Sequence, residues 1–489
     1  MVKDDQLPAA NANIGPGADR NDPGAAYSAA LGDLLRFRPS LEASLDALIA
    51  RHPDFAPAAL ARAYLGVLTS EPRPSREALA VLTAMEREVP HQKLSPAEQQ
   101  HLRVIEAWAA GHFGQAQKAL DALVATDPND VLALFAGHQL DFFLGDCVSL
   151  RDRIGRVLPD WDPRDPVYGF LLGMFAFGLE ECGWYDRAES VGTKALEFHP
   201  EDVWALHAVV HTHEMRGQVA LGLALMDQLA PHWTEGNFLN VHNFWHRALY
   251  LLELGDQDSV LSIYDRHLHN HSSAGVALEM LDAASLLWRL FLDGREETER
   301  FNALASAWEK WGEDGGGRSG DTSNESFYVF NDCHAVMALV GAGRYEEAER
   351  WVRELRRYAD TADDGLTNVE MTRAVGLPVA EALLAFGAGR HDEVVDLLLP
   401  IREGLARFGG SHAQRDAFQR TLLESSLRSG NYALARWLVN ERISLKEDSP
   451  YNWQARKSVA DAAGDPAAAH MADARVASLR GGWRRNYAG

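Results

Sequence analysis

The apolar positions of this chain fall into helix-length segments separated by turns rich in glycine, proline, aspartate and asparagine. Segments 114–125, 131–144 and 203–216 are examples, and we expect each to form one helix. An alternating apolar and polar run bounded by Asn-Gly or Asp-Gly, which would predict a strand pair, does not occur in the sequence. The pattern therefore predicts an all-α protein.

A short phrase, Gly-x-aromatic-x-x-Ala, recurs along the chain and begins at Gly111, Gly183, Gly343 and Gly430. It is typical of the turn and second helix of a tetratricopeptide unit. The glycine permits a tight turn, and we expect the aromatic side chain to fill the gap between packed helices. The alanine would let a neighbouring backbone approach closely. Such units bury their core by stacking one helix pair on the next.

Further turns at Gly217, Gly255, Gly294 and Gly389 complete the spacing. From glycine 183 onward the steps are 34, 38, 39, 49, 46 and 41 residues. The first equals the tetratricopeptide period, and the longer ones indicate inserted loops. We expect a right-handed α-α superhelix of about seven or more helix pairs, curled by its insertions into a compact, nearly closed shape. The Gly/Ser/Asp-rich residues 312–324 predict a flexible loop.

Composition divides the chain into three parts. Residues 1–24 are rich in Asn, Asp, Gly, Ala and Pro and are expected to be disordered. Residues 25–479 form the single tetratricopeptide-like helical repeat domain, and residues 480–489 are expected to be a flexible tail. The first segment also has no basic stretch followed by an apolar one, so we do not expect a secretory signal there.

Near its start, the repeat domain has three predicted features. Helix is expected from residue 25 to residue 50 with a break at His52 and Pro53, and from 60 to 68. Residues 71–74, with Pro72 and Pro74, are expected to be a loop because proline stops helices. Residues 95–98, with sequence Ser-Pro-Ala-Glu, have the pattern of a helix start with a capping box.

Charge and cysteine content narrow the class of function. The 489 residues carry 47 Lys and Arg against 70 Asp and Glu, for a net charge of −23. Nucleic acid and anionic membrane surfaces favour basic proteins, so we expect neither as a partner. Three scattered cysteines do not make a disulfide framework, which favours a reduced, cytoplasmic setting. No apolar run is long enough to span a membrane.

One predicted helix carries polar groups within an apolar sequence. In segment 203–216, His207, His211 and Glu214 fall within about 60° of one another at 100° per residue. His213 points away from them. An unpartnered polar group in a core costs a few kcal/mol, so this stripe needs partners.

Other apolar helices carry similar groups. His242 and His246 are separated by four residues and share a helix face. We expect the inner helices of the superhelix to bring these groups around one cavity. The candidate ligand-binding residues are His207, His211, Glu214, His242, Trp245, His246, Asn331, Asp332, His334, Arg415 and Asp416.

Three interpretations of this set remain open: a hydrogen-bond network without a guest, a divalent metal site, and a pocket for a small organic or peptide ligand. Metal ligands would come from His207, His211, His242 and His246, because histidines four residues apart have ligand spacing. Histidine with a carboxylate also has general-base spacing. The catalytic candidates are His211, Glu214, His246, Asp332 and His334. The sequence lacks His-Glu-x-x-His, a nucleophile elbow and a phosphate loop.

Several of these residues lie in phrases that resemble the tetratricopeptide repeat protein 38 family. The similar stretches are 204–215, 242–251, 330–334, 375–378, 397–402 and 409–416. The resemblance extends from about residue 103 to residue 458 and implies an all-helical repeat fold. It implies no activity, cofactor or catalytic residue. The chain departs from the family at His412, where asparagine is expected.

The leading functional hypothesis is a binding or scaffold protein that holds a small molecule or peptide on its inner surface. The alternative is an enzyme, either cofactor-independent or metal-dependent, that uses the same histidines and carboxylates for hydrolysis or isomerisation. No cofactor is required by the sequence, although a divalent metal is compatible with it.

Overall fold

The computed structural model describes residues 22–313 and 326–487, with side chains described as far as residue 481. Across these ranges the chain forms α-helices with a few 3₁₀ and π turns, and no strand occurs among them. The prediction of an all-α fold is confirmed. Almost all of the predicted disordered segment and of the predicted loop 312–324 lie outside the described residues. Gly312 itself is the penultimate residue of a helix.

The helices of the first half are α1 (Pro23–Leu35), α2 (Ser40–Arg51), α3 (Ala56–Val67), α4 (Pro72–Glu88), α5 (Pro96–Ala109), α6 (Phe113–Thr126), α7 (Val131–Phe143), α8 (Cys147–Val157), α9 (Tyr168–Glu181), α10 (Tyr185–Phe198), α11 (Val203–Met215), α12 (Val219–Gln228) and α13 (Ala230–Trp233). Those of the second half are α14 (Asn240–Leu254), α15 (Gln257–Ile263), α16 (Ala277–Leu292), α17 (Thr298–Glu313), α18 (Val329–Gly341), α19 (Tyr345–Thr361), α20 (Thr367–Met371), α21 (Leu377–Gly387), α22 (His391–Leu398), α23 (His412–Arg428), α24 (Tyr432–Leu445), α25 (Pro450–Ala462) and α26 (Pro466–Tyr487). Short turns are η1 (His91–Lys93), η2 (Leu158–Asp160), η3 (Tyr264–Leu268), η4 (Thr372–Gly376) and η5 (Leu399–Phe408).

The repeated phrase forms the predicted turns. Each of its four glycines has a positive φ, for example 76° at Gly183. Few residues other than glycine adopt this conformation. The four alanines are fully buried. The aromatic position varies more than expected. Phe113 is buried in the core, whereas Tyr345 and Tyr432 are 39% and 38% exposed.

Two local predictions near the N-terminus are wrong. The helix expected over residues 25–50 is divided into α1 and α2, because Phe37 takes a left-handed conformation (φ 54°) and Pro39 follows. The loop expected at residues 71–74 is the start of α4, with Pro72 as its first residue. The first-turn N–H groups of a helix have no partner within the helix, so proline is tolerated there.

The first and last helices extend beyond residues 25 and 479. Helix α1 begins at Pro23, where the side chain of Asp22 accepts hydrogen bonds from the N–H groups of Gly24 and Ala25. Helix α26 continues to Tyr487, so most residues expected in a tail are helical. The capping box at Ser95 and Glu98 is present as predicted. Within the described residues, no helix combines the length and the apolar character that crossing a membrane requires.

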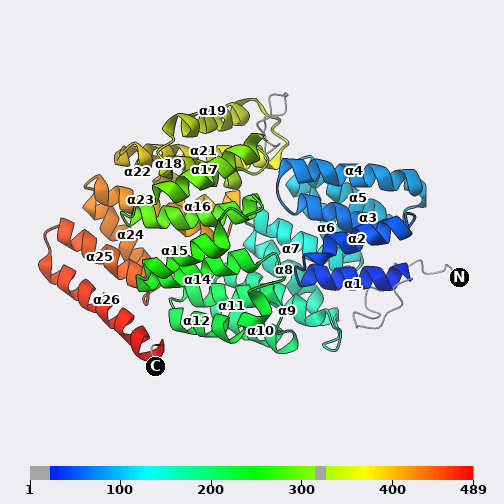
Figure 1. Ribbon diagram of the computed structural model, residues 1–489, viewed down its shortest axis with the longest axis horizontal. Helices are drawn as coiled ribbons and strands as arrows, with labels where there is room; N and C mark the ends of the chain where they lie inside the picture. The colour runs from blue at the N-terminus through cyan, green and yellow to red at the C-terminus, as the bar shows by residue number, and fades with distance from the viewer. Residues whose placement is uncertain (1–21, 314–325, 488–489) are drawn as a thin grey trace.

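The helices stack in sequence order and then close on one another (Figure 1). Helix α14 packs against both α11 and α16, and α23 packs against α11 and α16 as well. Contacts also join distant turns: the Nδ1 of His112 lies 3.0 Å from the carbonyl oxygen of Gly365. The inner surface is therefore covered by other helices of the same chain, and this is where the polar residues of α11 and α14 lie.

Candidate functional site

Helix α11 is buried on all sides. Every residue from Val203 to Glu214 is buried, so its histidines lie in the interior, whichever face they occupy. The carboxylate of Asp202 starts the helix and accepts hydrogen bonds from the N–H groups of Trp204 and Ala205. His213 points away from the stripe as expected and pairs with Gln218, with Nδ1 2.9 Å from Oε1.

Four imidazoles from α11 and α14 meet in one place. One ligand atom from each of His207, His211, His242 and His246 lies within 4.8 Å of the other three. The Nε2 of His242 lies 3.0 Å from the Nε2 of His207 and 3.2 Å from the Nε2 of His246. His242 is 17% exposed in its side chain, and His246 is fully buried. Trp245 stacks on the ring of His242.

Carboxylates lie behind these rings. The Nδ1 of His246 lies 2.8 Å from Oε2 of Glu214, and the Nδ1 of His242 lies 2.7 Å from Oδ2 of Asp282 on α16. Asp282 was missed from the sequence. It is completely buried. An acid in the mainly apolar run Met280–Leu292 of α16 was the feature of the sequence that could have identified it.

Glu180, at the end of α9, is a second missed residue. Its Oε2 lies 3.6 Å from the Nδ1 of His211, beyond hydrogen-bond distance. Both side chains are fully buried, and neither ring nitrogen of His211 has a hydrogen-bond partner. We call His207, His211, His242 and His246 together with Glu180, Glu214 and Asp282 the polar centre.

Glu181, the next residue, connects α9 to α23. Its Oε1 accepts a hydrogen bond from the N–H of His412, and its Oε2 lies 3.2 Å from Nη2 of Arg415. Arg415 also donates to the carbonyl oxygen of Gly410. We call the set Glu181, His412 and Arg415 the α9–α23 contact. The predicted candidate Arg415 therefore lies beside the polar centre, and both its Nη1 and its Nη2 already donate hydrogen bonds.

Four other candidates are not brought to the polar centre. They form hydrogen bonds or ion pairs with residues outside the polar centre. Asn331 donates to the carbonyl oxygen of Ser70, and Asp332 accepts from Trp351 and Ser326.

The remaining two are on α18 and α23. The Nδ1 of His334 lies 2.8 Å from the carbonyl oxygen of Phe330 in its own helix, and Asp416 pairs with Arg420 and Arg442. The expectation that all candidates line one cavity is therefore corrected for Asn331, Asp332 and His334. Asp416 forms its ion pairs elsewhere, but burial raises the pKa of Glu214 and the charge of Asp416 contributes to this rise. Helix periodicity could not predict how far from the polar centre the residues of α18 lie.

Burial sets the charge of the polar centre. It lowers the pKa of His207, His211 and His246 well below the usual range, and neighbouring imidazoles add to this effect. These rings are neutral at pH 7. Burial also raises the pKa of Glu214 to about 7, and that of Glu180 well above its usual value. Four imidazoles with converging nitrogens could hold a divalent metal ion.

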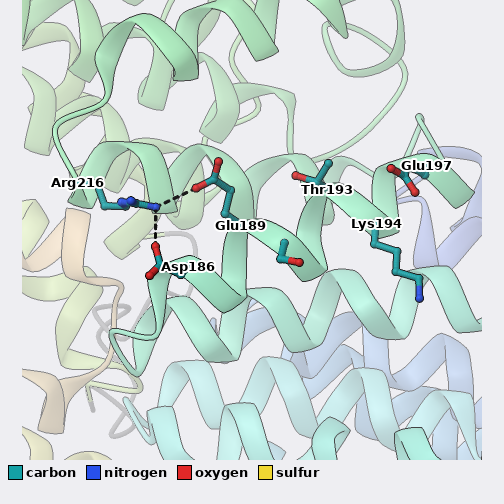
Figure 2. Close-up of a pocket in the computed structure, with 7 residues that line it drawn as sticks. Asp186, Glu189, Thr193, Lys194, Glu197 and Arg216 are labelled. Carbon is teal, nitrogen blue, oxygen red and sulfur yellow. Dashed lines mark hydrogen bonds and ion pairs between the residues drawn. The ribbon is translucent and has the colours of Figure 1, made fainter.

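A separate recess lies on the outer face of α10 (Figure 2). Its volume is about 610 Å³, and it is lined by Asp186, Glu189, Ser190, Thr193, Lys194, Glu197 and Arg216. Figure 2 shows Arg216 reaching both Asp186 and Glu189. The side chain of Asp186 is 94% exposed. These are solvent-exposed ion pairs on a shallow surface, and no residue of the polar centre lines the recess.

No protein-family model matches the chain. Among solved structures, the chain is similar to a human IFIT1 dimer with PPP-AAAA, at 13% identity and a TM-score of 0.42, with 91% of this chain and 96% of that one covered. It is also similar to the APC/C hetero-tetramer Cut9-Hcn1, at 13% identity and a TM-score of 0.34, covering 94% and 87%. A third is the P58(IPK) TPR domain, at 11% identity and a TM-score of 0.21, covering 80% and 97%. At these scores, nothing about ligands or partners carries over to this chain.

Proposed function

We propose that this chain is a helical-repeat binding protein that holds a small guest at the polar centre. The observation that carries the proposal is a group of fully buried ring nitrogens without partners: both nitrogens of His211 and the Nδ1 of His207. Buried polar groups are nearly always satisfied, and each one left unpaired costs about 1–3 kcal/mol. A guest that contacts these atoms would offset that cost.

The guest is small because the surroundings are closed. Helices α16 and α23 cover the inner face of α11 and α14, and the α9–α23 contact joins residues 231 positions apart. An extended peptide, which the sequence left open, would have to displace these helices. The net charge of −23 keeps nucleic acid out of the proposal.

We also propose that the chain is cytoplasmic and that it is a member of the tetratricopeptide repeat protein 38 family. The three cysteines, Cys147, Cys182 and Cys333, are free thiols, which supports a reducing compartment. The phrases that resemble the family contain His207, His211, Glu214, His242 and His246, the core of the polar centre.

Enzymatic activity is the second candidate function. The observation that favours it is the pairing of His246 with Glu214 and of His242 with Asp282, at 2.8 and 2.7 Å. A histidine oriented by a carboxylate on one nitrogen can accept a proton on the other. Hydrolysis of a panel of carboxylic and phosphoric esters, lost in Glu214→Gln while the melting temperature is kept, would support this candidate.

Binding is tested by native mass spectrometry and thermal denaturation of the purified chain. Probes are the chlorides of divalent metals, inorganic phosphate, and simple dicarboxylic and amino acids. We expect at least one probe to raise the unfolding temperature of the wild type, and the shift to be lost in His211→Gln. The control is His213→Gln, on the same helix but pointing away. Equal shifts in both variants, or none in the wild type, would contradict the proposal.

A further inference from the structure

We infer that the guest of the polar centre is a divalent transition-metal ion bound by His207, His211, His242 and His246. This inference rests on the proposed function, since it identifies the small guest by its chemistry. The residues come as two pairs at positions i and i+4 on neighbouring helices α11 and α14. Each pair presents two rings on one helix face, so two rigid elements supply all four nitrogens.

The first support is the spacing of the nitrogens. Ligands about 2.0–2.1 Å from a tetrahedral zinc ion are about 3.3–3.4 Å apart. The two Nε2 separations around His242 are 3.0 and 3.2 Å, and one ligand atom from each of the four residues lies within 4.8 Å of the others. The rings are close enough that small rotations would place all four at bonding distance from one ion.

The second support is the direction of the lone pairs. When Nδ1–H of His242 donates to Asp282 and Nδ1–H of His246 donates to Glu214, both Nε2 atoms are acceptors. These two acceptors face each other at 3.2 Å. Two lone pairs at that distance repel unless a cation lies between them. A protonated Glu214 that donates to His246 is the competing arrangement, and it corresponds to a hydrogen-bond network without a guest.

The third support is the set of outer carboxylates. Metal-bound histidines usually donate their other N–H to a carboxylate or carbonyl group, which fixes the ring and its tautomer. Asp282 and Glu214 already occupy these positions, and Glu180 faces the Nδ1 of His211 at 3.6 Å. A shift of less than about 1 Å would make this third contact a hydrogen bond. It would also provide a partner for the Nδ1 of His211, which has none.

The donor set defines the class of ion. Imidazole nitrogen suits Zn²⁺, Fe²⁺, Co²⁺, Ni²⁺ and Cu²⁺, whereas Mg²⁺ and Ca²⁺ prefer oxygen ligands. No cysteine belongs to the cluster. Four imidazole nitrogens within 4.8 Å of one another favour Zn²⁺, with Co²⁺ as its spectroscopic substitute.

The test uses the full chain, stripped with a chelator and titrated separately with Zn²⁺, Co²⁺ and Mg²⁺. We expect one equivalent of Zn²⁺ per chain by elemental analysis, the visible absorption of four-coordinate Co²⁺, and no stoichiometric Mg²⁺. The double variant His211→Ala/His246→Ala should lose both signals. The His213→Gln variant should keep both.

A second variant keeps the test valid should the double variant not fold. Glu180→Gln leaves the four imidazoles in place, and loss of an outer carboxylate should weaken Zn²⁺ binding about 10–100-fold. Zn²⁺ binding that is equal in the wild type and the double variant would place the ion elsewhere and overturn the inference. No metal binding, together with a retained shift from an organic probe, would overturn this inference alone. The absence of any binding would overturn the proposed function as well.

Discussion

At the scale of single residues, burial without a counter-charge is the strongest influence on acids. Burial raises the pKa of Asp202 to about 7, although the backbone N–H groups of Ala205 and Trp204 oppose the shift. Asp416 is less buried, with 24% of its side chain exposed, and Arg442, Arg420 and Arg289 hold its pKa far below the usual value. The two aspartates show that neighbouring guanidinium groups, and not depth alone, decide the charge state.

Asp202 makes stability depend on pH. Its pKa is about 7 in the folded chain and 3.8 in the reference state, so between these values the folded chain holds the extra proton. Its contribution to stability is therefore complete below about pH 4 and declines as pH rises to about 7. Asp202→Asn keeps a capping oxygen and removes the titration. We expect the variant to be more stable than the wild type at pH 8, by up to on the order of 4 kcal/mol, with the difference shrinking toward pH 4.

Denaturant unfolding of both proteins at pH 4.5, 6 and 8 measures this difference. The control is Asp202→Ala, which removes the cap and should lower stability by about 1 kcal/mol relative to Asp202→Asn at every pH. A difference between Asp202→Asn and the wild type that does not change with pH would rule out the assigned titration.

At the scale of elements, a glycine in a turn between helices can have one of two structural roles. Gly183 and Gly145 both have positive φ, 76° and 65°. A Cβ at Gly183 would meet nothing within 4 Å, whereas a Cβ at Gly145 would lie 1.7 Å from the carbonyl oxygen of Ala406. The first glycine serves only its own turn. The second also allows the α7–α8 turn to touch η5, which lies far along the chain.

We therefore expect unequal costs from one substitution. Gly183→Ala should lower the free energy of unfolding by about 1–2 kcal/mol, the cost of a left-handed alanine. Gly145→Ala adds a backbone clash, and we expect a total loss of about 2–5 kcal/mol. Chemical denaturation of the two variants compares them directly. Equal losses would mean that the contact with η5 contributes nothing.

The same distinction explains what could be predicted from the sequence. The turns at Gly183 and Gly217, and the shared stripe of His207 and His211, depend on local backbone geometry, so periodicity was sufficient. Asp282 and Glu180 lie behind histidines 40 and 31 residues away along the chain. That proximity depends on how whole helices stack. For the same reason, periodicity could not separate Asp332 from the polar centre.

At the scale of the whole molecule, closure places the polar centre in the interior. Two adjacent residues at the end of α9 contact different helices. Glu180 faces His211 of α11, and Glu181 binds the start of α23 through His412 and Arg415. The side chains of Glu181 and Arg415 are 4% and 9% exposed. Removal of one partner from a buried pair leaves the other charge without compensation, which costs about 3–5 kcal/mol.

Glu181→Gln should therefore loosen the closure and not only reduce stability. We expect faster hydrogen exchange at the first turns of α23 and at the end of α9, with little change in α3 and α5, which lie outside this contact. The matched control is Arg36→Ala, which removes a partly exposed ion pair with Glu201 between α1 and the start of α11. That variant should leave exchange in α23 unchanged. Uniformly faster exchange in Glu181→Gln would show that the α9–α23 contact contributes only to global stability, because a local closing contact must act first on the two helices that it joins.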